Sequence, residues 1–395
     1  MESLKNHRFF KSHLNLYLSL NAFFILNAAL NWPIIKFVGL KLVNGFDDLR
    51  IVLRASDCFS TLGDEIYTAR SGDCVYNYGS TLLSFLNFMR IDENDRVIAG
   101  YVLMFSTITV FAIVTKTLVP KLDFKSFSLI VLLFCSPPIM LLFERGNFDS
   151  LIFTLLGLSA IAAIKRIYLI EIILLSITAS FKFYTLPALY LRAAYREISL
   201  RSRILTFVLV ISTSYFVIKD LNLIFKGFSI PHSFHHAYGS SKTALILGYV
   251  IGFDFSKSQQ ILIGFLTTLI ITSLAIGLTV RKNLRFTQIH SGNRSQILIV
   301  MLFAEVYLAT YFAGLNYIYR LILILPVLIF LSLSAFRNRR AYVAISVISI
   351  WFSPWFYGSE LIGDFALFLI TNYLCWWMML TCWNAFKTKV NGETR

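Results

Sequence analysis

Apolar residues occupy most of the chain in long runs, and short polar segments separate these runs. Many runs reach about 20 residues, the length at which a helix crosses the roughly 30 Å hydrocarbon core of a bilayer. They lack the regular alternation of polar and apolar residues that a membrane β-barrel strand shows. Because a helix satisfies its backbone hydrogen bonds internally in lipid, the pattern predicts transmembrane helices.

Twelve stretches are candidate spans, and they lie at residues 14–39, 97–115, 126–143, 150–164, 167–181, 183–191, 204–222, 259–280, 296–314, 321–336, 341–356 and 364–386. Lys182 and Pro187 interrupt the stretch 167–191, which favours two short helices with a break over a single crossing. Broken helices occur at membrane depth only where they line a protein cavity. We therefore expect one all-α membrane domain over residues 1–395, a bundle of about 10–12 transmembrane helices.

The composition excludes an ordinary soluble domain. Of the 395 residues, 57% are hydrophobic and only 14% are charged, and the mean hydropathy is +0.70. Soluble domains average roughly 45–50% apolar and 25% charged residues. In water, a chain this apolar would expose more hydrophobic surface than a monomer tolerates.

The positive charge is distributed unevenly between the loops. The 36 Lys and Arg outnumber the 21 Asp and Glu and give a net charge of +15. With the N-terminus inside, 22 of the 36 basic residues fall on the cytoplasmic side, as the positive-inside rule requires. The charge thus indicates a multi-pass protein of the plasma (inner) membrane with both termini cytoplasmic. It is explained by topology and anionic membrane lipids, so we expect no nucleic-acid partner.

Two large loops then lie outside the cytoplasm, at residues 40–96 and 223–258. In the first, residues 80–91 predict a short helix in the membrane interface. Its apolar stripe consists of Leu82, Leu83, Leu86 and Met89. The second loop carries His232, His235 and His236, which could bind metal or shuttle protons. A polar loop with no specific duty is the alternative, and we expect no metal site.

Two of the five cysteines, Cys58 and Cys74, lie in the first outer loop. An oxidising exterior could join them in a disulfide bond. Sequence does not give the distance between their Cα atoms, so both the bridged and the free state stay open.

Polar residues also gather at the outer ends of several predicted helices. They are Asp47 and Asp48 after the first helix, Arg145, Asn147 and Asp149 between two helices, Lys182 and Tyr184 at the predicted break, and Asn316 and Arg320 before a late helix. A turn needs Gly and Asn but not several charges at the membrane boundary. Lys182 could simply extend to the interface, whereas its place at a break makes it a candidate site residue.

The segments around these residues, taken in order, resemble the GT-C superfamily of membrane glycosyltransferases. The resemblance is strongest to the bacterial polyprenyl-phosphate-mannose-dependent α-mannosyltransferases. The similar segments are Asp48-Leu49-Arg50-Ile51-Val52, Gly63 to Tyr67, Tyr76-Asn77-Tyr78-Gly79, Arg145 to Asp149, Phe181-Lys182-Phe183-Tyr184 and Phe312 to Arg320. This chain has Gly79-Ser80 where the family usually has Pro-Pro, and Thr185 where a Pro often follows Tyr.

The resemblance implies transfer of a sugar, mannose in that family, from a polyprenyl-phosphate donor to a glycolipid or glycan acceptor. No cofactor is implied. The acceptor hydroxyl must lose a proton, which a positioned carboxylate can take; Asp48 is the first candidate and Asp47 the second. The departing phosphate needs cations, for which Arg145, Lys182 and Arg320 are candidates. The candidates that hold sugar hydroxyls or acceptor are Asn147, Asp149, Tyr184 and Asn316.

Two other functions fit part of the sequence. A lipid-linked polysaccharide polymerase of the O-antigen type would also use outer arginines, but its donor is a diphosphate-linked oligosaccharide. A transporter or lipid-sugar flippase is the alternative from a different class. Such proteins often contain internal repeats and charges deep within helices, and the sequence shows no convincing repeat.

Overall fold

The computed structural model describes residues 2–37, 45–68, 74, 76, 78–194, 200–227, 237–281, 293–313, 316–333, 339–352 and 359–390. Within these ranges the regular secondary structure is helical except for two strands of two residues each, β1 (Ala237–Tyr238) and β2 (Asn316–Tyr317). The prediction of an all-α protein is therefore confirmed.

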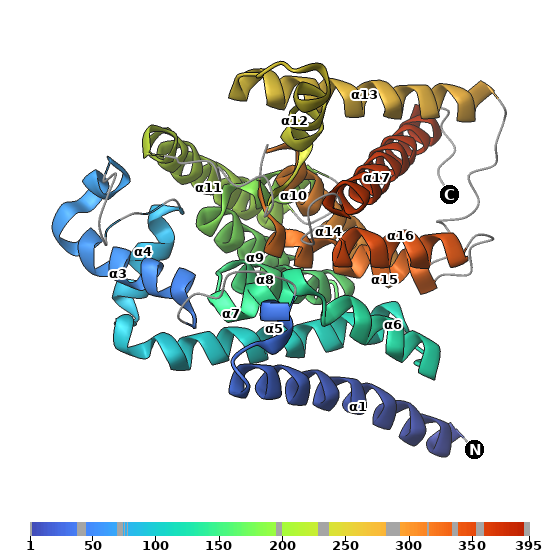
Figure 1. Cartoon of the computed structure of the whole chain (residues 1–395), viewed down its shortest axis with the longest axis horizontal. Coiled ribbons are helices and arrows are strands. Elements are labelled where there is room, and N and C mark those ends of the chain that lie inside the picture. The colour runs from blue at the N-terminus through green and yellow to red at the C-terminus, as the bar shows by residue number, and fades with distance from the viewer. Residues whose placement is uncertain are drawn as a thin grey trace.

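The α-helices follow one another along the chain (Figure 1). They are α1 (Glu2–Ala29), α2 (Pro33–Phe37), α3 (Asp47–Leu62), α4 (Ser80–Phe88), α5 (Arg96–Leu118), α6 (Phe124–Phe134), α7 (Pro137–Arg145), α8 (Asp149–Ile164), α9 (Tyr168–Phe181), α10 (Leu186–Ala194), α11 (Leu200–Gly227), α12 (Ser240–Ile251), α13 (Lys257–Arg281), α14 (Arg294–Phe312), α15 (Leu325–Leu333), α16 (Arg339–Trp351) and α17 (Ser359–Val390). The 3₁₀ turns are η1 (Gly63–Thr68), η2 (Glu93–Asp95), η3 (Phe183–Thr185) and η6 (Ile318–Ile324).

Five described helices are long and apolar enough to cross a membrane, and a bent pair could form a sixth span. The five are Glu93–Leu118, Ile204–Leu221, Ser258–Gly277, Arg294–Phe312 and Ile362–Leu380. Each of the twelve predicted ranges overlaps a helix, but fewer helices have full spanning length than the predicted 10–12. The difference arises because several apolar helices have only 10–17 residues, at Asp149–Ile164, Tyr168–Phe181, Ile318–Leu333 and Arg340–Trp351, and because two predicted stretches are divided.

Two of these divisions correct the predicted spans. The stretch 126–143 is bent by 52° between α6 and α7, where Pro137 begins the second helix and cannot continue the first. The stretch 14–39 is interrupted after α1, since Asn31 and Trp32 have φ angles of 57° and 53°, outside the range of a right-handed helix.

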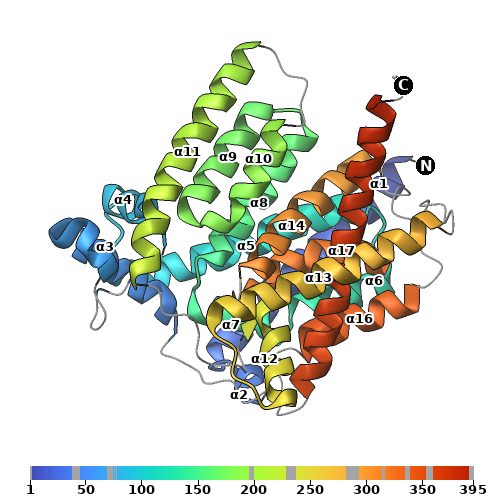
Figure 2. The same ribbon diagram turned by 90° about the horizontal axis from the view of Figure 1, so that it is seen from above.

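The stretch around Lys182 is broken, as its sequence predicted. Lys182 has extended backbone angles, with φ −142° and ψ 114°, and η3 follows it. The chain then turns back so that α10 packs against both α9 and α11 (Figure 2). Pro187 is accommodated in the first turn of α10, where a helix needs no N–H donor.

The first outer segment, residues 40–96 in the predicted topology, is more helical than predicted. Its first half forms α3, a helix that was not expected from the sequence, and α4 confirms the predicted short helix. Leu82, Leu83 and Leu86 are buried, but Met89 lies 52% exposed beyond the end of α4, so the stripe is shorter than predicted. Figures 1 and 2 place α3 and α4 at the end of the molecule opposite to the start of α1 and the end of α17.

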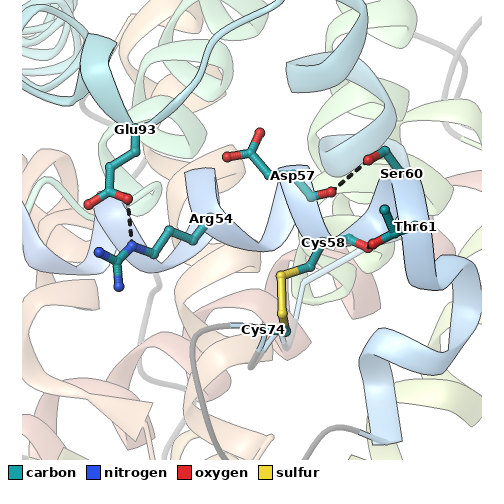
Figure 3. The surroundings of a disulfide bond; sticks show 7 residues. All are labelled: Arg54, Asp57, Cys58, Ser60, Thr61, Cys74 and Glu93. Carbon is teal, nitrogen blue, oxygen red and sulfur yellow. Dashed lines mark hydrogen bonds and ion pairs between the residues drawn. A yellow bond between two sulfur atoms is a disulfide. The ribbon is translucent and has the colours of Figure 1, made fainter.

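A disulfide bond joins Cys58 in α3 to Cys74, and their Cα atoms lie 5.8 Å apart (Figure 3). It connects α3 to the chain that leads to α4. In the second outer segment, α12 packs against α13, so this segment is not simply a polar loop. The three histidines of that segment lie outside the described residues.

The centre of the bundle contains closely packed aromatic side chains. Phe111 stacks on Phe134 with ring centroids 4.0 Å apart, and Phe153 lies 5.1 Å from Phe303. In lipid, such helix contacts are stabilised by close packing rather than by removal of apolar surface from water. The candidate site lies beside the start of α8, the end of α9 and η6, which follows α14.

Candidate functional site

Asp48 lies in the first turn of α3 and contacts two side chains from the connection between α7 and α8. The amide nitrogen of Asn147 donates to one carboxylate oxygen at 2.8 Å, and Nη1 of Arg145 donates to the other at 3.2 Å. The backbone N–H of Phe46 donates to the carbonyl of Glu144 at 2.6 Å and so joins the two segments. Asp48 therefore lies in a defined position despite its place in a long outer segment.

Gly146 permits this close approach. Its φ of 62° is left-handed, and a Cβ atom there would lie 2.9 Å from the ring of Phe46 and 3.1 Å from Cβ of Leu49. Glycine is the residue that adopts this backbone conformation without steric cost. A side chain at position 146 would thus push the start of α3, with Asp48, away from Asn147.

Asp47, the second candidate for the base, does not join this group. Its carboxylate pairs with Arg50, one turn further along the same helix, at 2.6 Å. Consecutive residues on a helix point about 100° apart, so Asp47 and Asp48 face different surroundings. The structure therefore brings only Asp48 to the other candidate residues.

Asp149 is the centre of a second group of charges. Its carboxylate is fully buried and accepts from Nζ of Lys182 at 2.8 Å and from Nε of Arg320 at 3.3 Å. The hydroxyl of Tyr184 donates to the same carboxylate. Three segments distant in the sequence therefore meet at one buried acid.

Asn147 connects the two groups. Its side-chain nitrogen serves Asp48, while its side-chain oxygen accepts from the backbone N–H of Asp149 at 2.9 Å and lies 3.4 Å from Nζ of Lys182. One asparagine has both a donor and an acceptor, so it can hold the base candidate and the buried cluster in a fixed relation.

Arg320 is held by the two-stranded ladder. Residues Ala237 and Tyr238 of β1 pair with Tyr317 and Asn316 of β2. The side chain of Asn316 accepts from Arg320 and donates to the carbonyl of Thr310. The second outer segment thereby supports a residue of the candidate site.

The charged side chains differ in accessibility. Those of Asp48, Arg145 and Arg320 are 16%, 27% and 20% exposed, whereas those of Lys182 and Asp149 are 4% and 0% exposed. A buried ammonium with a carboxylate partner is suited to stabilise the site from within. Accessible groups that could meet a substrate are Asp48 and the two arginines.

Two tyrosines that were not among the predicted site residues belong to the group. The ring of Tyr78 lies 4.4 Å from Nζ of Lys182, and its hydroxyl is 3.5 Å from the side-chain nitrogen of Asn147. The half-buried Tyr317 lies within electrostatic range of Asp48, Arg145 and Arg320. Both tyrosines lie in the segments that resemble the glycosyltransferase family. That resemblance is the feature of the sequence from which they could have been identified as site residues.

Burial raises the pKa of the Asp48 carboxyl above its usual range, and the nearby Arg145 and Asn147 oppose this shift. Desolvation disfavours the charged carboxylate, while a cation and a hydrogen-bond donor favour it. A carboxylate with a raised pKa is a stronger proton acceptor than an exposed one.

Comparisons with protein-family models, with curated proteins and with solved structures give no match.

Proposed function

We propose that this chain is a membrane glycosyltransferase of the GT-C type. It transfers a sugar from a polyprenyl phosphate to a hydroxyl of a glycolipid or glycan on the extracytoplasmic side. The observation that supports this most directly is the continuous group of contacts from Asp48 through Asn147 to Asp149 and Arg320. It combines an accessible carboxylate with accessible guanidinium groups, which are the two functions the reaction needs.

In this mechanism Asp48 is the general base. Its carboxylate takes the proton of the acceptor hydroxyl while the acceptor oxygen forms a bond to the anomeric carbon of the sugar. The bond from that carbon to the phosphate oxygen breaks, and its electron pair leaves with the polyprenyl phosphate. Arg145 and Asn147 hold the carboxylate at 3.2 and 2.8 Å, which fixes the direction in which it accepts the proton.

Arg320 and Arg145 bind the phosphate of the donor. A guanidinium group has five N–H donors in one plane, so the contacts of Arg320 with Asp149 and Asn316 orient it and leave further N–H groups for phosphate oxygens. Lys182 has a different role from the binding of the donor phosphate for which its sequence context made it a candidate. Because its ammonium is buried against Asp149, it supports the site instead of binding the donor directly.

Tyr184, Asn316 and Tyr317 shape the space beside these charges. The guanidinium of Arg320 lies 5.2 Å from the centroid of the Tyr184 ring, and the rings of Tyr317 and Tyr319 are stacked at 5.3 Å. Aromatic faces next to cations suit a sugar phosphate, since a ring packs against the sugar and the cation pairs with the phosphate.

The proposal includes the topology. The site lies outside the cytoplasm, the termini lie inside, and the short helices combine into about 10–12 crossings of the plasma (inner) membrane. The connections rich in Lys and Arg would then face anionic lipid at the cytoplasmic surface.

Product analysis tests this function. The purified protein is supplied with polyprenyl monophosphate sugars, with polyprenyl diphosphate oligosaccharides, and with candidate glycolipid acceptors. We expect sugar transfer from a monophosphate donor with release of polyprenyl phosphate. Transfer only from a diphosphate oligosaccharide would identify a polymerase. Movement of lipid-linked sugar across a vesicle membrane without transfer would identify a flippase.

A further inference from the structure

Asp220 is a buried carboxylate near the C-terminal end of α11, a helix whose exposed positions include several large apolar side chains. The exposed face of α11 includes Phe207, Ile211, Tyr215 and Ile218, whereas Asp220 is only 3% exposed. A charge in such a helix is costly unless it has partners, and it commonly marks a functional position. The partners of Asp220 come from the first outer segment.

Asp220 provides the N-terminal cap of α4. One of its carboxylate oxygens accepts from the backbone N–H of Ser80 at 2.7 Å and from the Ser80 hydroxyl at 3.0 Å. Gly79, the residue before α4, has no side chain that could serve as a cap. A carboxylate is suited to this place, because helix N-termini have unsatisfied N–H groups and a partial positive charge.

The contact between Asp220 and the start of α4 also involves the end of α9, next to the break at Lys182. The N–H of Gly79 donates to the carbonyl of Phe181 at 3.2 Å. A Cβ atom at position 79 would lie 2.0 Å from the carbonyl oxygen of Ser180 and 3.2 Å from the carboxylate of Asp220. Gly79 thus packs closely between α11 and the end of α9. The α9 residues that it contacts, Ser180 and Phe181, directly precede Lys182.

Tyr78 directly precedes Gly79 in the sequence, and it contacts the candidate site. Its ring lies below the Lys182 ammonium, its hydroxyl approaches Asn147, and its carbonyl accepts from the hydroxyl of Tyr67 at 3.1 Å. A displacement of Gly79 and Ser80 would therefore move Tyr78, and through Asn147 would alter the support of Asp48.

We propose that Asp220 is a positioning residue that fixes Gly79 and Ser80, holds Tyr78 against Asn147 and Lys182, and so orients Asp48 for catalysis. This assignment rests on the proposed glycosyltransferase function. Asp220 does not touch the reacting atoms; it acts through Tyr78.

Lys219 provides a matched control. It is the neighbour of Asp220 in α11 and pairs with Asp64 of the same outer segment at 3.3 Å, but both partners are about half exposed. Lys219→Ala therefore removes a contact between the same two parts of the chain without releasing the start of α4. An exposed ion pair contributes little, roughly 0–1 kcal/mol.

The first experiment is a double-mutant cycle on sugar transfer with Asp220→Ala and Tyr78→Phe. A small misplacement of catalytic groups can cost up to about 100-fold in rate. We expect Asp220→Ala to lower kcat at least about tenfold with little change in KM for the donor. In the double variant, kcat should be less than about twofold below that of Tyr78→Phe alone, because the effects of coupled residues are not additive. Lys219→Ala should keep kcat within about twofold of the unaltered protein.

Hydrogen exchange of residues 76–88 in the unaltered protein and the two α11 variants separates this proposal from the proposed function. Asp220→Ala should speed exchange in this segment, and Lys219→Ala should not. Unaltered protein that transfers no sugar would defeat the proposed function, and exchange alone would then decide whether Asp220 holds the segment. Unchanged exchange in Asp220→Ala, or full additivity with Tyr78→Phe in an active enzyme, would overturn the positioning role.

Discussion

Asn147 and Asp48 are separated by 99 positions in the sequence, yet the side-chain nitrogen of Asn147 lies 2.8 Å from a carboxylate oxygen of Asp48. Through its side-chain oxygen the same asparagine contacts the segment that contains Asp149 and Lys182. The nitrogen of the amide donates and its oxygen accepts, so an exchange of the two atoms would break both connections.

The pH dependence of transfer should report Asp48. Its burial raises the pKa of the carboxyl, and only the unprotonated form can accept a proton. The rate should therefore fall as the pH drops through this raised pKa and reach its plateau above it. Asn147→Ala removes a hydrogen bond that lowers the pKa, so the acid limb of kcat/KM should move to higher pH. An acid limb that stays in place or moves to lower pH would contradict this account.

Arg320→Ala should reduce the use of the donor while the protein remains inserted in the membrane. Loss of one group that stabilises developing charge typically costs about 10²–10³-fold in kcat. Arg320→Lys should restore only part of the rate, because lysine keeps the charge but not the planar pair of N–H donors. Arg54→Ala is the control, since Arg54 pairs with Glu93 outside the site at 2.5 Å. Unchanged donor kinetics in Arg320→Ala would remove this residue from the site.

Asp149→Ala should destabilise the protein strongly. It leaves the Lys182 ammonium, which is 4% exposed, without its carboxylate partner. Removal of one member of a buried ion pair typically costs about 3–5 kcal/mol. The control Asp64→Ala breaks a half-exposed pair with Lys219 and should cost less than about 1 kcal/mol. Thermal unfolding in detergent measures both, and equal midpoints for the two variants would contradict the proposed support by Asp149.

The disulfide between Cys58 and Cys74 should stabilise the first outer segment. The bond spans 16 positions, and closing a loop of about 15 residues contributes up to roughly 3 kcal/mol. A reductant should lower the unfolding temperature of the unaltered protein and of Cys375→Ser, but not that of Cys58→Ser. Cys375 is a free cysteine and so serves as the control. The same midpoint for Cys58→Ser and the unaltered protein would show that this bond does not stabilise the segment.

The sequence was sufficient to predict the helical class and the break at Lys182, because these depend on local composition. Apolar runs define helices, and charges at the ends of such runs are conspicuous. The bend before Pro137 and the helix α3 were harder to locate, since they depend on packing against other parts of the chain. The burial of Lys182 could not be predicted, because its partner Asp149 lies 33 positions away.

Asp47 and Asp48 illustrate the same limit at a single site. Both are acidic and adjacent, and the sequence could only rank them. The helix α3 gives them different surroundings, because it directs Asp48 toward Asn147 and leaves Asp47 paired with Arg50.

The most direct test of the central claim is therefore the transfer rate of Asp48→Asn beside that of Asp47→Asn. Asparagine preserves the size of aspartate but cannot take the proton, and loss of a general base typically costs about 10²–10⁴-fold. We expect Asp48→Asn to abolish measurable transfer from the polyprenyl-phosphate donor and Asp47→Asn to retain at least about a tenth of it. The reverse pattern would assign the base to Asp47, and full activity in both variants would contradict the mechanism.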